Sequence, residues 1–470
     1  MNHLEADGFL SDAAERIGTP CFVYLTERLE ERIRLLRTQF KDALELSFAV
    51  KSNPNPALLH WLAGHLGHLD ISSVGEMRLA LKAGWNPARL SFTGPGKREA
   101  ELHEAIAGGV GLLVLESLRE ARLADRIARS LLLTQPVLVR IAPDRVPKGF
   151  GDQMAGRPSA FGIDIEDADE AIAEIRQLSG LRLAGFHIYS GTQCLKAEAV
   201  AENYRHYLAI FERLCTTHGI APETLVLGAG LGVPYHDADA PFDLASLAGE
   251  VLPDLTAFKT KRLFRNTHLL LELGRYLVSE SGYFLTRVVS VKQSRGSRIA
   301  ICDGGMNNHL PASGHFGMVV RRNYSMHKVG AEGEQCEKVD IVGPLCTSID
   351  RLAGGIELPR LEEGDLLAVH NSGAYGLTAS PIHFISHAPP REVLVVEGEL
   401  QDVSRNFADS GPVLVGRGHT TIIPTTVNSP LGPPRRGLLL EPAANAAAAP
   451  WGNLCDADTP NLRGREGFAV

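Results

Sequence analysis

The chain alternates short apolar runs with longer stretches in which apolar residues recur every three or four positions. A short apolar run is typical of a buried strand, and the three-to-four spacing is typical of an amphipathic helix. Six helices are predicted at residues 56–64, 73–84, 99–107, 118–130, 167–178 and 197–218. Eight strands are predicted at residues 46–50, 68–71, 89–93, 110–115, 136–141, 181–188, 224–227 and 268–273.

Eight buried strands that alternate with helices predict a (β/α)8 barrel, whose active site lies at the carboxyl ends of its parallel strands. A doubly wound open sheet would give the same alternation. Glycines distinguish the two, because the run Gly228–Gly232 follows the seventh strand and Gly274 with Arg275 follows the eighth. Barrels of this kind bind phosphate at these two loops, although a glycine-rich turn without a ligand is the simpler alternative.

The residues at the predicted strand ends are mostly polar. Lys51 follows the buried first strand, which the Asn53-Pro54 step stops. Burial at a strand end is expected to lower the pKa of an amine toward the neutral form that makes a Schiff base. A solvated surface lysine is the alternative. The other strand ends carry Asp70, Thr93, Glu116, Arg140, His187, Gly228 and Glu272.

Composition narrows the class of protein. The chain has 470 residues, 44% hydrophobic and 22% charged, which predicts a globular protein of two domains with appendages. Its net charge of -8 argues against nucleic acid as a partner. Neither a basic signal-peptide region nor a membrane-length apolar run is present, so a cytoplasmic protein is expected. Seven scattered cysteines without a CxxC pair favour reduced thiols and imply no metal.

Three strand-end residues suit one cofactor. Lys51 is placed to form an imine, Glu272 to keep a ring nitrogen protonated, and His187 to stack on a ring. Together they fit pyridoxal phosphate, whose protonated pyridine is an electron sink. Each residue also has an ordinary alternative, since His187 fits a satisfied core position and Glu272 fits an ion pair with Arg275. Their meeting at one barrel mouth favours the cofactor.

Nine ordered motifs then identify a family resemblance. The chain resembles the fold-type III pyridoxal-phosphate decarboxylases, in particular the diaminopimelate and ornithine decarboxylase group, over about residues 20 to 397. The resemblance implies a pyridoxal-phosphate-dependent carboxy-lyase. The motifs are AVKSNP at 49–54, LDISSVGE at 69–76, SAFGI at 159–163, HIYSGTQ at 187–193, GAGLG at 228–232, ELGRYLV at 272–278, CDGGMNN at 302–308, GPLCTSID at 343–350 and GDLLAVHNSGAYGLTASP at 364–381.

The resemblance also implies a domain plan. The barrel spans 26–277, and a β-rich, sandwich- or barrel-like domain spans 278–397 together with 1–25. Residues 398–470 are rich in Pro, Gly, Ala and Asn and are predicted to form a disordered tail. The family forms homodimers with shared active sites, so the Cys346 loop and Tyr375 are expected to serve the lysine of a partner chain. Strand-like runs in the second domain are 21–25, 283–291, 298–302, 339–342, 365–370 and 392–396.

Residue roles follow from matching motif to motif. The resemblance makes Lys51 the Schiff-base lysine, His187 the ring-stacking residue and Cys346 the acid that protonates the substrate α-carbon. Thiols are suitable proton donors, whereas a small buried hydrophobe is the alternative for this cysteine. The implied cofactor-binding residues are Lys51, Asp70, His187, Ser190, Gly230, Glu272, Gly274, Arg275 and Tyr375. The implied substrate-binding residues are Thr347, Asp350 and Tyr375.

Two departures from the family concern the substrate. Thr347 stands where diaminopimelate decarboxylases have glutamate and ornithine decarboxylases have aspartate, and residues 310–313 replace the arginine-containing RPALY segment. With the GAYGLTASP ending, these changes resemble decarboxylases of specialised biosynthesis, some of which act on acylated or carrier-tethered amino acids. We therefore expect a substrate without a free distal ammonium, although Asp350 is a nearby acid that would reach an ammonium if the loop turned tightly.

Three other functions stay open at this point. A diaminopimelate decarboxylase proper would keep the whole framework and differ only in the distal pocket. An amino-acid racemase would share the barrel and the cofactor, but GPLCTSID resembles the decarboxylases. A non-catalytic regulatory relative would lose the cofactor contacts that this chain retains.

Overall fold

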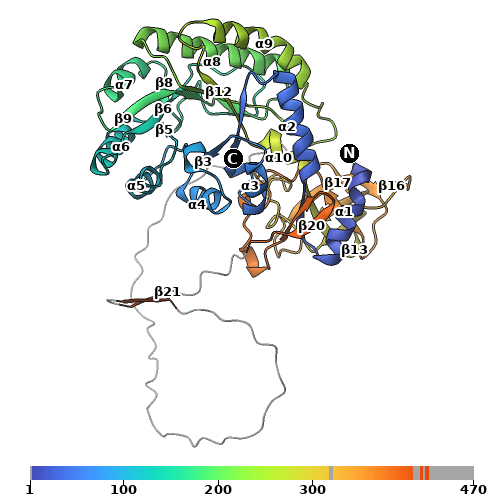
Figure 1. Ribbon diagram of the computed structural model, residues 1–470. Helices are drawn as coiled ribbons and strands as arrows, with labels where there is room; N and C mark the ends of the chain where they lie inside the picture. Colours follow the sequence, from blue (N-terminus) through green and yellow to red (C-terminus); the bar gives the residue numbers. More distant parts are fainter. Residues whose placement is uncertain (1–2, 317–320, 406–412, 417–418, 423–470) are drawn as a thin grey trace, which may run out of the picture. The chain divides into compact units, whose positions relative to one another are not determined.

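The computed structural model describes residues 3–316, 321–405, 413–416 and 419–422 (Figure 1). Residues up to Asn406 form one compact unit. The two short strands β21 (Val413–Gly416) and β22 (His419–Ile422) belong to a second unit, where they pair antiparallel.

Eight parallel strands close into a barrel in the order β5-β4-β3-β2-β12-β11-β9-β6, and the pairing of β6 with β5 completes the ring. The closed ring confirms the barrel over the open sheet. Every predicted barrel strand is present, with ends that differ from the prediction by at most two residues. The strands are β2 (Glu45–Ala49), β3 (His68–Ile71), β4 (Leu90–Phe92), β5 (Leu112–Leu115), β6 (Gln135–Ala142), β9 (Leu181–Ile188), β11 (Thr224–Gly228) and β12 (His268–Leu273).

Helices surround the barrel strands (Figure 1). In α2 the buried side chains Leu29, Ile33, Leu36 and Phe40 recur at helical spacing, and this face packs inward. Ser73, immediately before α4, caps that helix by accepting a hydrogen bond from the backbone N–H of Glu76. The helices are α2 (Thr26–Phe40), α3 (Pro56–Ala63), α4 (Val74–Lys82), α5 (Glu99–Ala107), α6 (Leu118–Ser130), α7 (Ala168–Ile175), α8 (Ala197–His218) and α9 (Leu244–Thr260).

The barrel interior is a packed apolar layer. Val114, Leu138, Ala184, Val226 and Leu270 come from five different strands and form one buried cluster. A (β/α)8 barrel is filled by side chains in this way, so ligands have access only at its ends. The polar strand-end residues therefore lie on a closed apolar floor.

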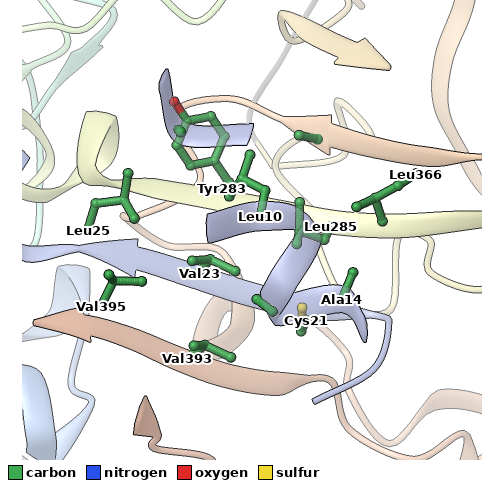
Figure 2. Close-up of a cluster of buried hydrophobic side chains, with 13 residues drawn as sticks. Leu10, Ala14, Cys21, Val23, Leu25, Tyr283, Leu285, Leu366, Val393 and Val395 are labelled. Carbon is green, nitrogen blue, oxygen red and sulfur yellow. The ribbon is translucent and has the colours of Figure 1, made fainter. Parts of the chain in front are cut away.

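The second domain is a mixed sheet of nine strands that includes the N-terminal strand β1. β1 pairs antiparallel with β13 and parallel with β19. Figure 2 shows its core, in which Leu10 and Ala14 of α1 (His3–Arg16) pack with Val23 and Tyr283. The strands are β1 (Cys21–Leu25), β13 (Gly282–Ser294), β14 (Ser297–Cys302), β15 (Met326–Lys328), β16 (Cys336–Val342), β17 (Arg351–Pro359), β18 (Leu366–Val369), β19 (Arg391–Val396) and β20 (Glu399–Asp402).

Ordered structure continues past residue 397, where the tail was predicted to begin. β20 pairs antiparallel with β19, because the turn at Glu397 and Gly398 adopts the positive φ angles that reverse the chain. The remainder of the predicted tail lies outside the described residues, apart from β21 and β22. In the described part of the chain, no helix is long and apolar enough to cross a membrane.

Candidate active site

The carboxyl ends of the barrel strands surround a cavity of about 480 Å³. Five of the predicted site residues line it together: Lys51, His187, Glu272, Arg275 and Tyr375. The rule that barrel active sites lie at the carboxyl ends of strands therefore located the cavity from sequence. Other lining residues include Phe92, Thr93, Lys97, Glu101, Arg140, Asp152, Met154, Phe161, Tyr189, Thr192 and Phe316.

Lys51 lies on a single 3-10 turn, Val50–Ser52, that follows β2. Its side chain is exposed into the cavity, and Nζ lies 5.6 Å from the centroid of the Tyr189 ring. The backbone N–H of Tyr375 donates to the carbonyl of Ser52 at 2.8 Å, so the loop that carries Tyr375 is fixed to the lysine turn. Lys51 is therefore held by backbone contacts while its amine remains accessible.

The charge on Lys51 differs from the sequence-based expectation. Burial lowers the pKa of Lys51, but the nearby carboxyl groups, Glu272 first and then Asp70, outweigh burial and raise it above the ordinary value. Desolvation alone therefore gave the wrong sign. Lys51 is a cation that two carboxyl groups stabilise.

His187 and Glu272 form a buried pair at the ends of β9 and β12. His187 Nε2 lies 2.8 Å from Glu272 Oε2. Burial would raise the pKa of Glu272, but the hydrogen bond from His187 and the charges of Lys51 and Arg140 lower it to about 2. Burial also lowers the pKa of His187, against the opposing effect of Glu272. The pair is therefore a neutral imidazole that donates from Nε2 to an ionised carboxylate.

Asp70 lies below the cavity lining rather than in it. Its carboxyl group accepts hydrogen bonds from the hydroxyls of Thr93 and Ser91. Burial, followed by the nearby charge of Glu272, raises its pKa well above the ordinary value, although Lys51 acts in the opposite direction. Asp70 therefore influences the site indirectly, through its electrostatic interaction with Lys51 and its hydrogen bond from the Thr93 hydroxyl.

Arg275 stands at the side of the cavity where phosphate binding was predicted. It follows Gly274 and begins the short helix α10 (Arg275–Val278). Its Nη1 donates to the Tyr235 hydroxyl at 2.8 Å, and its guanidinium lies 4.9 Å from the centroid of the Tyr375 ring. Gly230, in the preceding strand-end loop, has a φ of +69°, and a Cβ there would lie 2.7 Å from Phe150 Cε1. Only glycine fits this backbone approach.

These residues fit pyridoxal phosphate. Two buried polar atoms of the cavity lining, His187 Nδ1 and Arg275 Nε, have no hydrogen-bond partner within the described residues. Buried polar atoms without partners mark places where a ligand completes the hydrogen bonding. An amine, an ionised carboxylate and an arginine are the groups that a carbonyl, a pyridine nitrogen and a phosphate require.

Ser190 was predicted to contact the phosphate, and its hydroxyl instead faces the protein interior. It donates to Asn203 Oδ1 at 3.1 Å and also contacts the Tyr207 hydroxyl. Ser190 is fully buried and is not among the residues that line the cavity. Its role as a phosphate ligand stays a prediction.

The loop after β16 carries the predicted substrate residues and lies apart from the cavity of its own chain. Cys346 is exposed, and neither it nor Thr347 lines the cavity. The Asp350 carboxylate accepts two backbone hydrogen bonds, from the N–H of Met306 at 2.7 Å and that of Leu345 at 2.8 Å. Asp350 therefore fixes the loop, which argues against the expected reach toward a distal ammonium.

Tyr375 also differs from the expectation of a residue that serves a partner chain. It lines the cavity of its own chain, beside Ser52 and Arg275. The reason is local: a Cβ at Gly373 would lie 1.8 Å from the Val278 carbonyl, so the loop packs directly against α10.

Several lining residues were missed from the sequence. Asp152 and Thr192 belong to a two-stranded ribbon of β7 (Asp152–Gln153) and β10 (Gly191–Thr192), which forms one wall of the cavity. Strands of two residues are too short for a periodic signal. The strand β8 (Ile163–Asp164), which pairs with β6, is equally short.

Glu116 was predicted at a strand end, but its organising role was not. Its carboxylate accepts the N–H groups of Gly94 at 2.6 Å and Gly162 at 3.0 Å and pairs with Arg140 at 3.0 Å. Three strand-end loops therefore meet on one buried side chain. Sequence spacing does not show such convergence.

Comparison with known proteins agrees with this geometry. Residues 26–279 match the family described as pyridoxal-dependent decarboxylase, pyridoxal binding domain. A relative from Niallia circulans, L-glutamyl-[BtrI acyl-carrier protein] decarboxylase, is 33% identical, and the match covers 83% of this chain and 92% of the relative. Diaminopimelate decarboxylase of Aquifex aeolicus is also 33% identical, over 83% of this chain and 90% of that protein.

Solved structures show the same fold. A crystal structure of an Aquifex aeolicus protein superposes with a TM-score of 0.73 at 30% identity, covering 84% of this chain and 91% of that one. Diaminopimelate decarboxylase from Helicobacter pylori, complexed with L-lysine, gives a TM-score of 0.73 at 26% identity, covering 82% and 94%.

The barrel and its lysine, histidine–glutamate pair and arginine thus define a pyridoxal-phosphate enzyme. The chain belongs to the pyridoxal-dependent decarboxylase family and is a pyridoxal-phosphate-dependent carboxy-lyase. The resemblance predicted from the nine motifs is confirmed.

Proposed function

We propose that the protein removes the α-carboxylate from an amino acid or amino-acid derivative that has no free distal ammonium. The proposal rests on the hydrogen bonds of the Asp350 carboxylate, which already accepts from two backbone N–H groups. The residue at the acidic position of the family is the neutral Thr347. Burying an ammonium without an anionic partner costs several kcal/mol. The loop therefore disfavours diaminopimelate, lysine and ornithine.

A free distal carboxylate also lacks a partner. The segment that replaces the family arginine, residues 310–313, contains no cationic side chain, and the preceding His309 has its Nε2 3.0 Å from the Ser372 hydroxyl. Among the described residues that line the cavity, Lys97 pairs with Glu120 at 2.6 Å and Arg140 pairs with Glu116. The arrangement therefore favours a distal amide or thioester, as an acylated or carrier-tethered amino acid has.

The relatives support this class without deciding it. The Niallia circulans relative is named for a glutamyl group on an acyl-carrier protein, which has no distal ammonium. The Aquifex aeolicus relative, at the same identity, is a diaminopimelate decarboxylase. Diaminopimelate decarboxylation is therefore the alternative function.

The cofactor, when bound, supplies the electron sink that accepts the electrons left by the departing CO₂. Lys51 would hold its carbonyl end, Arg275 with the Gly230 loop and Gly274 would hold the phosphate, and Glu272 would keep the ring nitrogen protonated. His187 keeps Glu272 ionised through the 2.8 Å hydrogen bond. The Cys346 thiol returns a proton to the α-carbon in the cavity of a partner chain, which makes the protein a homodimer.

The test compares kcat/KM for CO₂ release from three substrates: meso-diaminopimelate, free L-glutamate and an L-glutamyl thioester. We expect the thioester to be preferred by at least about tenfold, since an unpaired buried charge costs at least about 1.4 kcal/mol. Thr347→Glu should shift preference toward diaminopimelate by restoring an acid in the loop, and Thr347→Ser is the matched control.

Efficient turnover of diaminopimelate by the unaltered protein would contradict the proposal. An unchanged substrate preference in Thr347→Glu would show that Thr347 does not determine specificity.

A further inference from the structure

A cationic hollow is lined by residues that precede β7 and follow β10 in the chain. Its volume is about 660 Å³, and its lining includes the exposed side chains of Arg145, Lys148 and Lys196. These residues come from the loop after β6 and from the start of α8. Neither the strand-end rule nor the family motifs had pointed to this surface.

The three cationic side chains have no partner among the described residues. Within the described residues, none of their side chains makes a hydrogen bond or an ion pair. In contrast Arg205, at the edge of the same hollow, pairs with Asp254 at 2.7 Å and Glu250 at 3.3 Å. Unpaired cations that converge on one concave surface are expected to bind an anion.

The acidic residues of the hollow lie to one side. Glu198 and Glu202 project from successive turns of α8, and Glu250 is already paired with Arg205. Glu198 and Glu202 repel an anion, so the anion site lies at the Arg145 and Lys148 side of the hollow.

The hollow and the active-site cavity are linked through the chain segments on either side of the β7–β10 ribbon. Asp152 and Thr192 line the cavity, and Lys148 and Lys196 are each four residues from one of them in sequence. A Cβ at Gly149 would lie 3.4 Å from Lys196 Cδ, so the two cationic loops are in contact. Four residues span at most about 14 Å, so the cationic side chains are anchored within that distance of residues that line the cavity.

We infer that the hollow binds the phosphodiester of a 4′-phosphopantetheine arm, with the amino acid at the end of the arm in the cavity. This inference rests on the proposed function, and it names the form in which the substrate arrives. Such an arm is a neutral chain with a single phosphate group. The phosphate matches the one cationic site, and the neutral chain matches a cavity in which a distal charge has no partner. We favour a carrier protein as the molecule to which the arm is attached, because the hollow is an open surface and a relative is named for a carrier-bound substrate.

The test uses two L-glutamyl thioesters that differ only in the phosphate, one of 4′-phosphopantetheine and one of pantetheine. We expect the unaltered protein to favour the phosphorylated thioester in kcat/KM by about tenfold, with the preference falling as salt increases. Lys148→Glu with Lys196→Glu should abolish the preference and leave turnover of the pantetheine thioester unchanged.

Lys82→Glu is the matched control. Lys82 is an exposed lysine at the last turn of α4. Helices of the barrel run opposite to the strands, so this position lies at the other end of the barrel. The control should keep the full preference for the phosphorylated thioester.

Calorimetric titration with 4′-phosphopantetheine alone gives a readout that does not depend on turnover. Binding that the double variant loses and Lys82→Glu retains would support the inference. Equal kcat/KM for the two thioesters, or equal calorimetric binding by all three proteins, would overturn it while the proposed function stands. Failure to decarboxylate either thioester would instead contradict the proposed function. A coenzyme A thioester that is turned over faster than a carrier-bound one would overturn the choice of a carrier protein.

Discussion

At the residue scale, two carboxyl groups determine the properties of Lys51. Glu272 and Asp70 raise its pKa although burial acts in the opposite direction. Glu272 is in turn kept ionised by the hydrogen bond from neutral His187. A change at Glu272 therefore alters the ring-nitrogen contact and the charge balance at the lysine together.

The first prediction concerns the identity of the reactive lysine. Borohydride reduction of the purified protein followed by peptide mapping should place the pyridoxyl group on Lys51. Its side chain is exposed in the cavity and forms no salt bridge with a described residue. Lys97 is the internal control, since its Nζ is engaged by Glu120 and by the carbonyls of Gly94 and Val114. A pyridoxyl group on Lys97 would refute the assignment.

The second prediction separates catalysis from cofactor binding at Glu272. Glu272→Gln keeps the size of the side chain and removes its charge, so kcat should fall on the order of 100-fold or more, as for loss of one preorganised electrostatic contact. Cofactor affinity should change by much less, because Lys51 and Arg275 remain.

The absorbance of the bound cofactor gives the affinity, and CO₂ release gives kcat. Since the ionised carboxylate of Glu272 is the first of the groups that raise the pKa of Lys51, that pKa should also fall in this variant. Retained activity in Glu272→Gln would contradict the proposal that Glu272 keeps the ring nitrogen protonated.

At the element scale, the barrel strands could be predicted from the sequence because both of their faces are buried. Strands such as β9 and β12 are nearly continuous apolar runs, and their predicted ends agree with the structure. In contrast β17 has a Gly354-Gly355 step, and β20, with the sequence ELQD, is a polar edge strand. Such strands are determined by their pairing partners, so their own sequences carry little signal.

The same limit applies to the site residues. A motif places Ser190 and Asp350 in the chain, but hydrogen-bond partners decide what they do. The Ser190 hydroxyl turns to Asn203 and Tyr207, and the Asp350 carboxylate turns to the backbone at Met306 and Leu345. Except for Leu345, these partners lie 13 or more residues away in sequence, so residue type and spacing could not reveal them.

At the scale of the whole molecule, the thiol assigned to proton transfer lies outside the cavity that holds Lys51 of the same chain. Cys346 is exposed in a loop beside the exposed Ile349, whose carbonyl lies 3.1 Å from His315 Nε2. The proton-donor role proposed for Cys346 therefore requires a second copy of the chain to complete the site. The expected assembly is a two-fold dimer, in which the same surface serves both chains.

The final prediction tests this sharing by mixing two variants that are inactive for different reasons. Lys51→Ala lacks the cofactor lysine, and Cys346→Ala lacks the proton donor. After the two dimers are dissociated and reassociated together, half of the dimers should be mixed, and each mixed dimer should have one intact site, restoring about a quarter of full activity. A mixture of Lys51→Ala with a Lys51→Ala, Cys346→Ala double variant is the control and should stay inactive. Activity no greater than the sum of the two variants would show that each chain completes its own site, and Cys346 would then lose its proposed role.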